Sequence, residues 1–155
     1  MSILPPSHLS NGSLGYRVSS TLDKSTPRKS LIDRDSGTCW TSTQGLPQWV
    51  ELTFAEPVVP ETIELTFQGG FVGTRAAVQV ATSSSSTGDA RQAREWTLLK
   101  NIYPEDVNRK QRFDVSSPTD ASPVTSMKLI FEESSDFFGR ITIYDLDVLG
   151  RSATS

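Results

Sequence analysis

The sequence predicts an all-β domain of antiparallel strands. Two observations support this: short segments with alternating apolar residues, or rich in β-branched and aromatic residues, recur along the chain, and turn residues separate them. The length of 155 residues suits one domain that buries its own core. We expect a leader at residues 1–13, rich in Pro, Ser, Asn and Gly, the domain at 14–150 and a tail at 151–155.

Seven segments have the composition of strands. The first two, residues 49–54 and 62–67, are separated by Pro57 and Pro60, which predict a turn between them. The serine-rich segment 83–89 has little apolar surface to bury and is expected to form a hairpin loop. The other five predicted strands are residues 76–82, 95–99, 111–115, 127–131 and 140–149.

The last predicted strand changes its inward face. The apolar positions around Ile143 are odd-numbered, whereas those around Leu146 are even-numbered. Since side chains alternate strictly along a strand, this slip predicts a β-bulge near Tyr144 and Asp145. A bulge re-aims side chains, so Asp145 either points toward a site or faces solvent as an ordinary carboxylate.

Composition and charge argue against several classes of function. A net charge of −3 and one short basic run at residues 109–112 do not favour binding to nucleic acid. No apolar run approaches the roughly 20 residues that span a bilayer. The single histidine, His8, lies in the leader, and no zinc spacing or phosphate-binding loop occurs, so we predict no catalytic residues.

The N-terminal segment and the cysteine content predict an intracellular protein. No basic stretch followed by an apolar one marks a secretory signal. The single cysteine, Cys39, has no partner for an internal disulfide, whereas small secreted β-domains often carry such bonds. We therefore expect the protein in the nucleus, the cytoplasm or both.

Several segments together resemble the discoidin, or coagulation factor type C, family across residues 14–150. The resemblance implies a galactose-binding-like jelly-roll β-sandwich. Segments such as Thr38–Trp40, Gln44–Val50 and Asp136–Arg140 further resemble a small intracellular branch of animal proteins associated with a nuclear receptor. The cysteine pair of extracellular discoidin domains is absent. The segments that carry the family resemblance are residues 31–40, 48–52, 67–70, 94–98 and 143–150.

The turn at residues 31–42 has the side chains of a cation site. Asp33, Asp35 and Thr38 offer the hard oxygen donors that Ca²⁺ prefers. The resemblance implies one structural Ca²⁺ or other cation. The alternative is a turn in which the same side chains bond backbone N–H groups without a metal. The implied ligands are Ser30, Asp33, Asp35, Thr38, Tyr144 and Asp145, with Ser30 and Tyr144 contributing carbonyls.

Two loops are candidates for a binding face. The segment 67–75 contains three glycines and matches a loop that contacts ligands in the resembled family, and 136–140 carries two adjacent phenylalanines beside an arginine. Exposed aromatic residues and arginine are typical of interface hot spots. The alternative is that both rings plug the end of the sandwich. Trp40 and Trp49 are expected in the core. The candidate residues are Gln68, Gly69, Gly70, Phe71, Arg75, Phe137, Phe138 and Arg140.

We therefore predict a non-catalytic intracellular binding module that acts through protein–protein interaction. By resemblance, this includes a role as a nuclear-receptor-associated transcriptional cofactor. Two alternatives stay open: a carbohydrate-binding module, and a subunit of a larger assembly such as a ciliary transport complex or a ubiquitin ligase.

Overall fold

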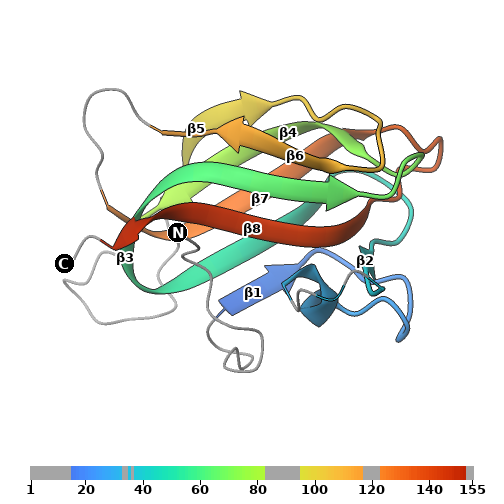
Figure 1. Ribbon diagram of the computed structural model, residues 1–155, viewed down its shortest axis with the longest axis horizontal. Helices are drawn as coiled ribbons and strands as arrows, with labels where there is room; N and C mark the ends of the chain where they lie inside the picture. The colour runs from blue at the N-terminus through green and yellow to red at the C-terminus, as the bar shows by residue number, and fades with distance from the viewer. Residues whose placement is uncertain (1–14, 33–34, 36, 83–94, 117–122, 153–155) are drawn as a thin grey trace.

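The computed structural model describes residues 15–32, 35, 37–82, 95–116 and 123–152. In this part of the chain no helix is long and apolar enough to cross a membrane. The predicted leader and the serine-rich loop lie outside the described residues. The elements are β1 (Gly15–Val18), the 3-10 turn η2 (Arg28–Leu31), β2 (Trp40–Thr41), β3 (Gln48–Phe67), β4 (Gly73–Ala81), β5 (Thr97–Ile102), β6 (Lys110–Asp114), β7 (Val124–Ser134) and β8 (Thr142–Ser152), as Figure 1 shows.

The long strand β3 belongs to both layers of the sandwich. Its first part, residues 48–53, pairs with β1 and β7, and its last part, residues 58–67, pairs with β6 and β8. One layer has the order β1-β3-β7-β4-β5 and the other β6-β3-β8-β2, and each of these pairs is antiparallel. The predicted all-β jelly-roll sandwich is therefore confirmed.

The predicted turn between residues 54 and 62 is wrong, because β3 continues through this segment. Its pairing shifts register between Thr53 and Val58 on the β7 side and between Pro60 and Thr62 on the β8 side. Proline has no N–H to donate to a ladder, so it is tolerated where pairing is interrupted. Pro57 and Pro60 thus lie where the strand exchanges partners, and they do not end it.

The predicted bulge in the last strand is confirmed. Thr66 pairs with Asp145, whereas the next residue of β3, Phe67, pairs with Ile143. Tyr144 is therefore the extra residue on β8. The bulge lets Ile143 and Leu146 both face the interior, where each is fully buried.

The core lies between the two layers. The rings of Phe67 on β3 and Phe131 on β7 meet edge to face, with 5.9 Å between their centroids. Trp40 is fully buried, as predicted. The largest fully buried side chains also include Leu31, Leu52, Ile63, Leu65, Met127, Leu129, Ile141, Ile143 and Leu146.

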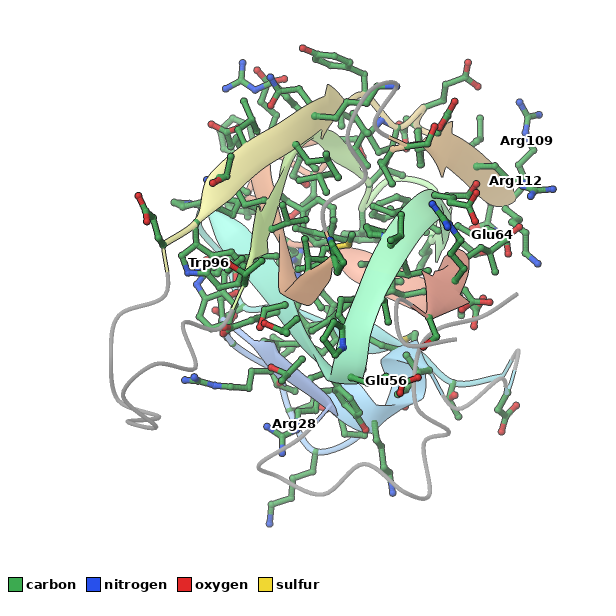
Figure 2. The ribbon with its side chains drawn as sticks, turned by 90° about the vertical axis from the view of Figure 1, so that its left-hand side faces the viewer. Arg28, Glu56, Glu64, Trp96, Arg109 and Arg112 are labelled. Carbon is green, nitrogen blue, oxygen red and sulfur yellow. The ribbon has the colours of Figure 1, made fainter. Side chains whose placement is uncertain are left out.

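The prediction that Trp49 belongs to the core is wrong. Val50 and Leu52 point inward, so strict alternation places Trp49 on the outer face of its layer. The ammonium of Lys128 lies 5.6 Å from the Trp49 ring centroid and 4.4 Å from that of Trp96. Figure 2 shows Trp96 at the margin of the molecule.

The basic run at residues 109–112 is balanced by acidic neighbours. The Arg112 guanidinium lies 3.1 Å from the carboxylate of Glu64, and that of Arg109 lies 3.3 Å from Glu105. Figure 2 shows Arg109, Arg112 and Glu64 at the same edge of the sandwich. The run is thus part of a mixed-charge surface.

Gly150 permits a close approach of β8 to β3, which gives a test of the fold. A Cβ atom at this position would lie 2.3 Å from the backbone oxygen of Val59. We expect Gly150→Ala to lower the free energy of unfolding by about 1–3 kcal/mol, because the two strands must move apart.

Gly37→Ala is the matched control, since the nearest atom to a Cβ there is Asp35 Oδ1 at 3.4 Å. It should change the free energy by less than about 0.5 kcal/mol. Chemical denaturation measures both variants. Equal stabilities for the two variants would contradict this packing of β8 on β3.

Candidate functional site

Three loops lie side by side at one end of the sandwich: residues 68–72 between β3 and β4, 103–109 between β5 and β6, and 135–141 between β7 and β8. The carboxylate of Asp106 joins all three. Its Oδ1 accepts hydrogen bonds from the Gly70 backbone N–H at 2.8 Å and from the Ser135 hydroxyl at 3.2 Å. Asn108 Oδ1 also accepts from the Gly69 N–H at 2.9 Å. One side chain of the middle loop thus sets the spacing of its two neighbours.

The glycine loop is also held from the other side. The Val72 N–H donates to the Ser135 hydroxyl, and the Ser135 N–H donates to the Val72 carbonyl, both at 2.9 Å. The Thr142 N–H donates to the Phe71 carbonyl at 3.0 Å. Gly69 and Gly70 therefore form a tight turn, closed by the Phe71 N–H on the Gln68 carbonyl, that the surrounding loops fix, and Phe71 has a defined position.

Arg140 is oriented by the partly buried carboxylate of Asp136. Asp136 Oδ2 accepts hydrogen bonds from the Arg140 backbone N–H at 3.0 Å and from its Nε at 3.2 Å. The guanidinium carbon lies 5.4 Å from the Phe71 ring centroid and 5.9 Å from that of Phe138. The side chain of Asp136 is 11% exposed and that of Arg140 is 31% exposed. The arginine is thus fixed against two rings while part of it stays accessible.

The pKa of Asp136 reflects these contacts. Burial acts to raise the pKa of the carboxyl group, but the backbone N–H, the side-chain hydrogen bond and the positive charge of Arg140, with the Phe138 N–H, outweigh it. The pKa therefore lies below its ordinary value of 3.8. Asp136 is ionised at neutral pH and balances the charge of Arg140.

Apolar side chains surround the arginine on the surface. Phe137 is 93% exposed and Phe138 54% exposed, and their rings meet edge to face at 5.3 Å. Leu46, 43% exposed, belongs to a neighbouring loop whose Gly45 N–H donates to the Phe138 carbonyl at 2.8 Å. We call the residues Leu46, Phe71, Phe137, Phe138 and Arg140 the Phe–Arg patch.

Gly139 allows the β7–β8 loop to approach the loop that contains Gly45 and Leu46. It has a φ of +85°, and a Cβ there would lie 3.1 Å from Leu46 Cγ and from the Gly45 backbone. A side chain at this position would be strained and would push Leu46 away from Phe138. The glycine therefore keeps the Phe–Arg patch continuous.

Most of the predicted binding residues come together in space. Gln68, Gly69, Gly70 and Phe71 form the glycine loop, and Arg140 contacts Phe71 from the β7–β8 loop. The alternative that both phenylalanines plug the end of the sandwich is wrong, since both are exposed. Arg75 is engaged elsewhere, in ion pairs with Glu132 at 3.7 Å and Glu133 at 3.2 Å on β7.

Sequence reasoning missed Leu46, Asp106 and Asp136. Asp136 and Arg140 carry opposite charges within one short loop, and this closeness in the sequence is the signal for their pairing. Leu46 and Asp106 carry no such local signal, because their partners lie far away in the sequence.

The proposed cation turn is only partly described. Asp33 lies outside the described residues. Asp35 Oδ1 accepts the Gly37 N–H at 2.9 Å, and its carbonyl accepts the Thr38 N–H at 3.1 Å, the hydrogen bonds of an Asx-type turn. Ser30 is buried in η2, and Tyr144 and Asp145 lie at the bulge.

The oxygen donors of this turn suit Ca²⁺, but the described residues alone do not complete a site. Among them, no three His, Cys, Asp or Glu side chains are grouped to hold a metal ion. A site at this turn needs Asp33 as well, so the cation stays a prediction.

The role of Asp106 is tested by its removal. We expect Asp106→Ala to speed hydrogen exchange of the Gly70 amide and to lower the free energy of unfolding by about 1 kcal/mol, because two donors lose their acceptor. NMR-detected exchange measures the first effect. Glu105→Ala, the adjacent surface acid, is the control and should leave the Gly70 exchange rate unchanged. An unchanged exchange rate of the Gly70 amide in Asp106→Ala would contradict the proposed role of Asp106 in holding this loop.

The Asp136–Arg140 pair predicts a pH dependence of stability. Because folding lowers the pKa of Asp136, the ionised carboxylate contributes stability above pH 3.8, and this contribution is lost as the pH falls below that value. We expect the wild type to be more stable than Asp136→Asn at pH 7, and the difference to shrink below about pH 4. Denaturation curves from pH 7 to pH 3 measure it. A difference that stays constant would contradict the shift.

Comparisons with known proteins identify the family of this chain. The family model described as Sad1/UNC-like C-terminal matches residues 21–152. The nuclear receptor 2C2-associated protein of Danio rerio is 40% identical over 137 residues, covering 86% of this chain and 89% of the relative. The human protein of that name is 39% identical over 137 residues, with the same coverage of 86% and 89%.

Solved structures with low sequence identity share the architecture. Chitosan-binding module 1 of a chitosanase/glucanase from Paenibacillus sp. IK-5 has a TM-score of 0.68 at 17% identity, covering 91% of this chain and 99% of the module. The family 32 carbohydrate-binding module of Clostridium perfringens NanJ, in complex with galactose, has a TM-score of 0.66 at 18% identity, covering 86% and 90%. These likenesses show the galactose-binding-like jelly roll. The chain therefore belongs to the Sad1/UNC-like C-terminal domain family, as a relative of the nuclear receptor 2C2-associated proteins.

Proposed function

We propose that this chain is a non-catalytic module that binds a protein partner through the Phe–Arg patch. One observation carries the proposal: Phe137 and Phe138 are 93% and 54% exposed beside an arginine that a partly buried carboxylate holds in place. Aromatic residues and arginine dominate interface hot spots. Since Arg140 is already oriented, little conformational entropy is lost when a partner contacts it.

The relatives supply the first partner to test. Their name describes association with nuclear receptor 2C2, and this chain aligns with them over most of its length. We extend to this chain the role of a nuclear-receptor-associated transcriptional cofactor, acting in the nucleus or the cytoplasm. If the partner binds in a fixed stoichiometry, the same proposal makes this chain a subunit of a stable assembly.

A carbohydrate ligand is the second candidate. The galactose complex of a module with the same fold favours it, as does the pairing of aromatic rings with an arginine N–H donor. The composition of the Phe–Arg patch favours the protein partner, because Arg140 is its one polar side chain, whereas a sugar presents several hydroxyls that need hydrogen-bond partners.

The proposal is tested with purified nuclear receptor 2C2 and isothermal titration calorimetry. We expect the double variant Phe137→Ser/Phe138→Ser to weaken binding by about 2 kcal/mol or more, roughly 30-fold, because two central apolar contacts are lost. Leu98→Ser on β5 is the matched control, since Leu98 is 54% exposed, as Phe138 is. Its affinity should equal that of the wild type.

Other outcomes have defined meanings. Equal binding by the double variant and the wild type would contradict the use of this patch. If the receptor does not bind, affinity capture from native cells followed by mass spectrometry identifies stoichiometric partners, which the double variant must fail to capture. Saturable binding on a glycan array, lost in the double variant, together with no protein partner, would replace the proposal with the carbohydrate candidate.

A further inference from the structure

Asp136, beside the Phe–Arg patch, balances the charge of Arg140, the one ionisable residue of the patch. Asp136 accepts two hydrogen bonds from Arg140 and neutralises it. Within the described residues neither Nη nitrogen of Arg140 donates a hydrogen bond to another residue. The side chain of Arg140 is 31% exposed, so a ligand can reach these nitrogens. The guanidinium thus presents N–H donors at a fixed angle, without a net charge to attract a counter-ion.

The surrounding loops carry no excess of positive charge. Residues 43–47 and 68–72 contain no ionisable side chain. Residues 103–109 and 135–141 contain two arginines, Arg109 and Arg140, against three acids, Glu105, Asp106 and Asp136, a net charge of −1. A negatively charged ligand would meet repulsion here, and it would lose hydration without gaining an unbalanced cation.

A backbone carbonyl satisfies the Nη donors without these costs. Every peptide offers such acceptors, and a neutral carbonyl oxygen needs no counter-charge. The exposed sides of Leu46, Phe137 and Phe138 then remain to cover apolar side chains of the same peptide.

We infer that the partner segment recognised by the Phe–Arg patch is an apolar peptide without acidic residues, whose backbone carbonyl accepts from the Nη groups of Arg140. This inference rests on the proposed function and specifies the chemistry of the partner. It excludes an acidic motif as the recognised element, although the site contains an arginine.

The probe is a displayed library of random twelve-residue peptides selected on the wild-type protein. We expect enrichment of peptides with two or more apolar residues and a depletion of Asp and Glu relative to the unselected library. Synthetic versions of the enriched peptides should change their Kd less than threefold between 50 and 500 mM NaCl, because no net charge is paired on binding.

Variants separate the contacts. Arg140→Lys should weaken binding at least tenfold, since lysine lacks the planar fork of donors and packs less well against two rings. Its melting curve is compared with that of the wild type. If it melts early, Leu46→Ser, an exposed loop position, takes its place and should weaken binding at least fivefold. Leu98→Ser is the control and should bind as the wild type does.

Contrary results separate the two proposals. Enriched peptides rich in Asp or Glu, a Kd that rises more than tenfold with salt, or unchanged binding by Arg140→Lys would overturn the inference while leaving the patch as the interaction site. Enriched peptides that bind Phe137→Ser/Phe138→Ser as tightly as the wild type would overturn the proposed function itself. No enrichment on the wild type would count against both.

Discussion

The structure depends on one strand that serves two layers. β3 pairs on both sides in each of its two parts, with β1 and β7 in its first part and with β6 and β8 in its last. The exchange occurs around Pro57 and Pro60, where the ladder is already interrupted. Because the two layers share this strand, their relative position is set by continuous backbone and does not rely on side-chain packing alone. The loops that follow β3 and precede β8 are brought together by the same constraint.

The sequence predicted the fold where local pattern and burial agree. The alternation in residues 62–67 and 127–131 and the change of parity in β8 are direct consequences of which side chains face the core, and the structure matches them. β1 and β2 have four and two residues, too few to show a period. The turn predicted between residues 54 and 62 does not form, because a proline can interrupt the hydrogen bonds of a strand without reversing the chain. The prediction that Trp49 lies in the core is wrong because it rested on the size of the side chain. The alternating pattern, in which Val50 and Leu52 face the core, places Trp49 on the outer face.

The candidate site was predicted in its parts and not in its connections. Phe71, Phe138 and Arg140 follow from loop composition and from resemblance, and they do meet in space. Asp106 is separated from Gly70 by 36 positions, and its role depends on the backbone N–H of Gly70 and the hydroxyl of Ser135, two distant donors that no local pattern identifies. In the sequence, Leu46 resembles any other loop leucine. It joins the Phe–Arg patch because the Gly45 N–H donates a hydrogen bond to the Phe138 carbonyl. Long-range contacts of this kind are determined by topology, which a single sequence reveals only through its regular elements.

The place of β8 in the sheet has a consequence for folding. Among the strands of the described residues β8 comes last in chain order, yet it lies between β2 and β3 and not at an edge. Trp40 in β2 pairs with Ile143, so its partner is more than a hundred residues away along the chain. Non-local pairing of this kind slows folding to roughly milliseconds to seconds in all-β domains. Residues 142–152 must therefore leave the ribosome before the layer that contains β8 can form. Until then the apolar interior of the nascent domain stays exposed to solvent.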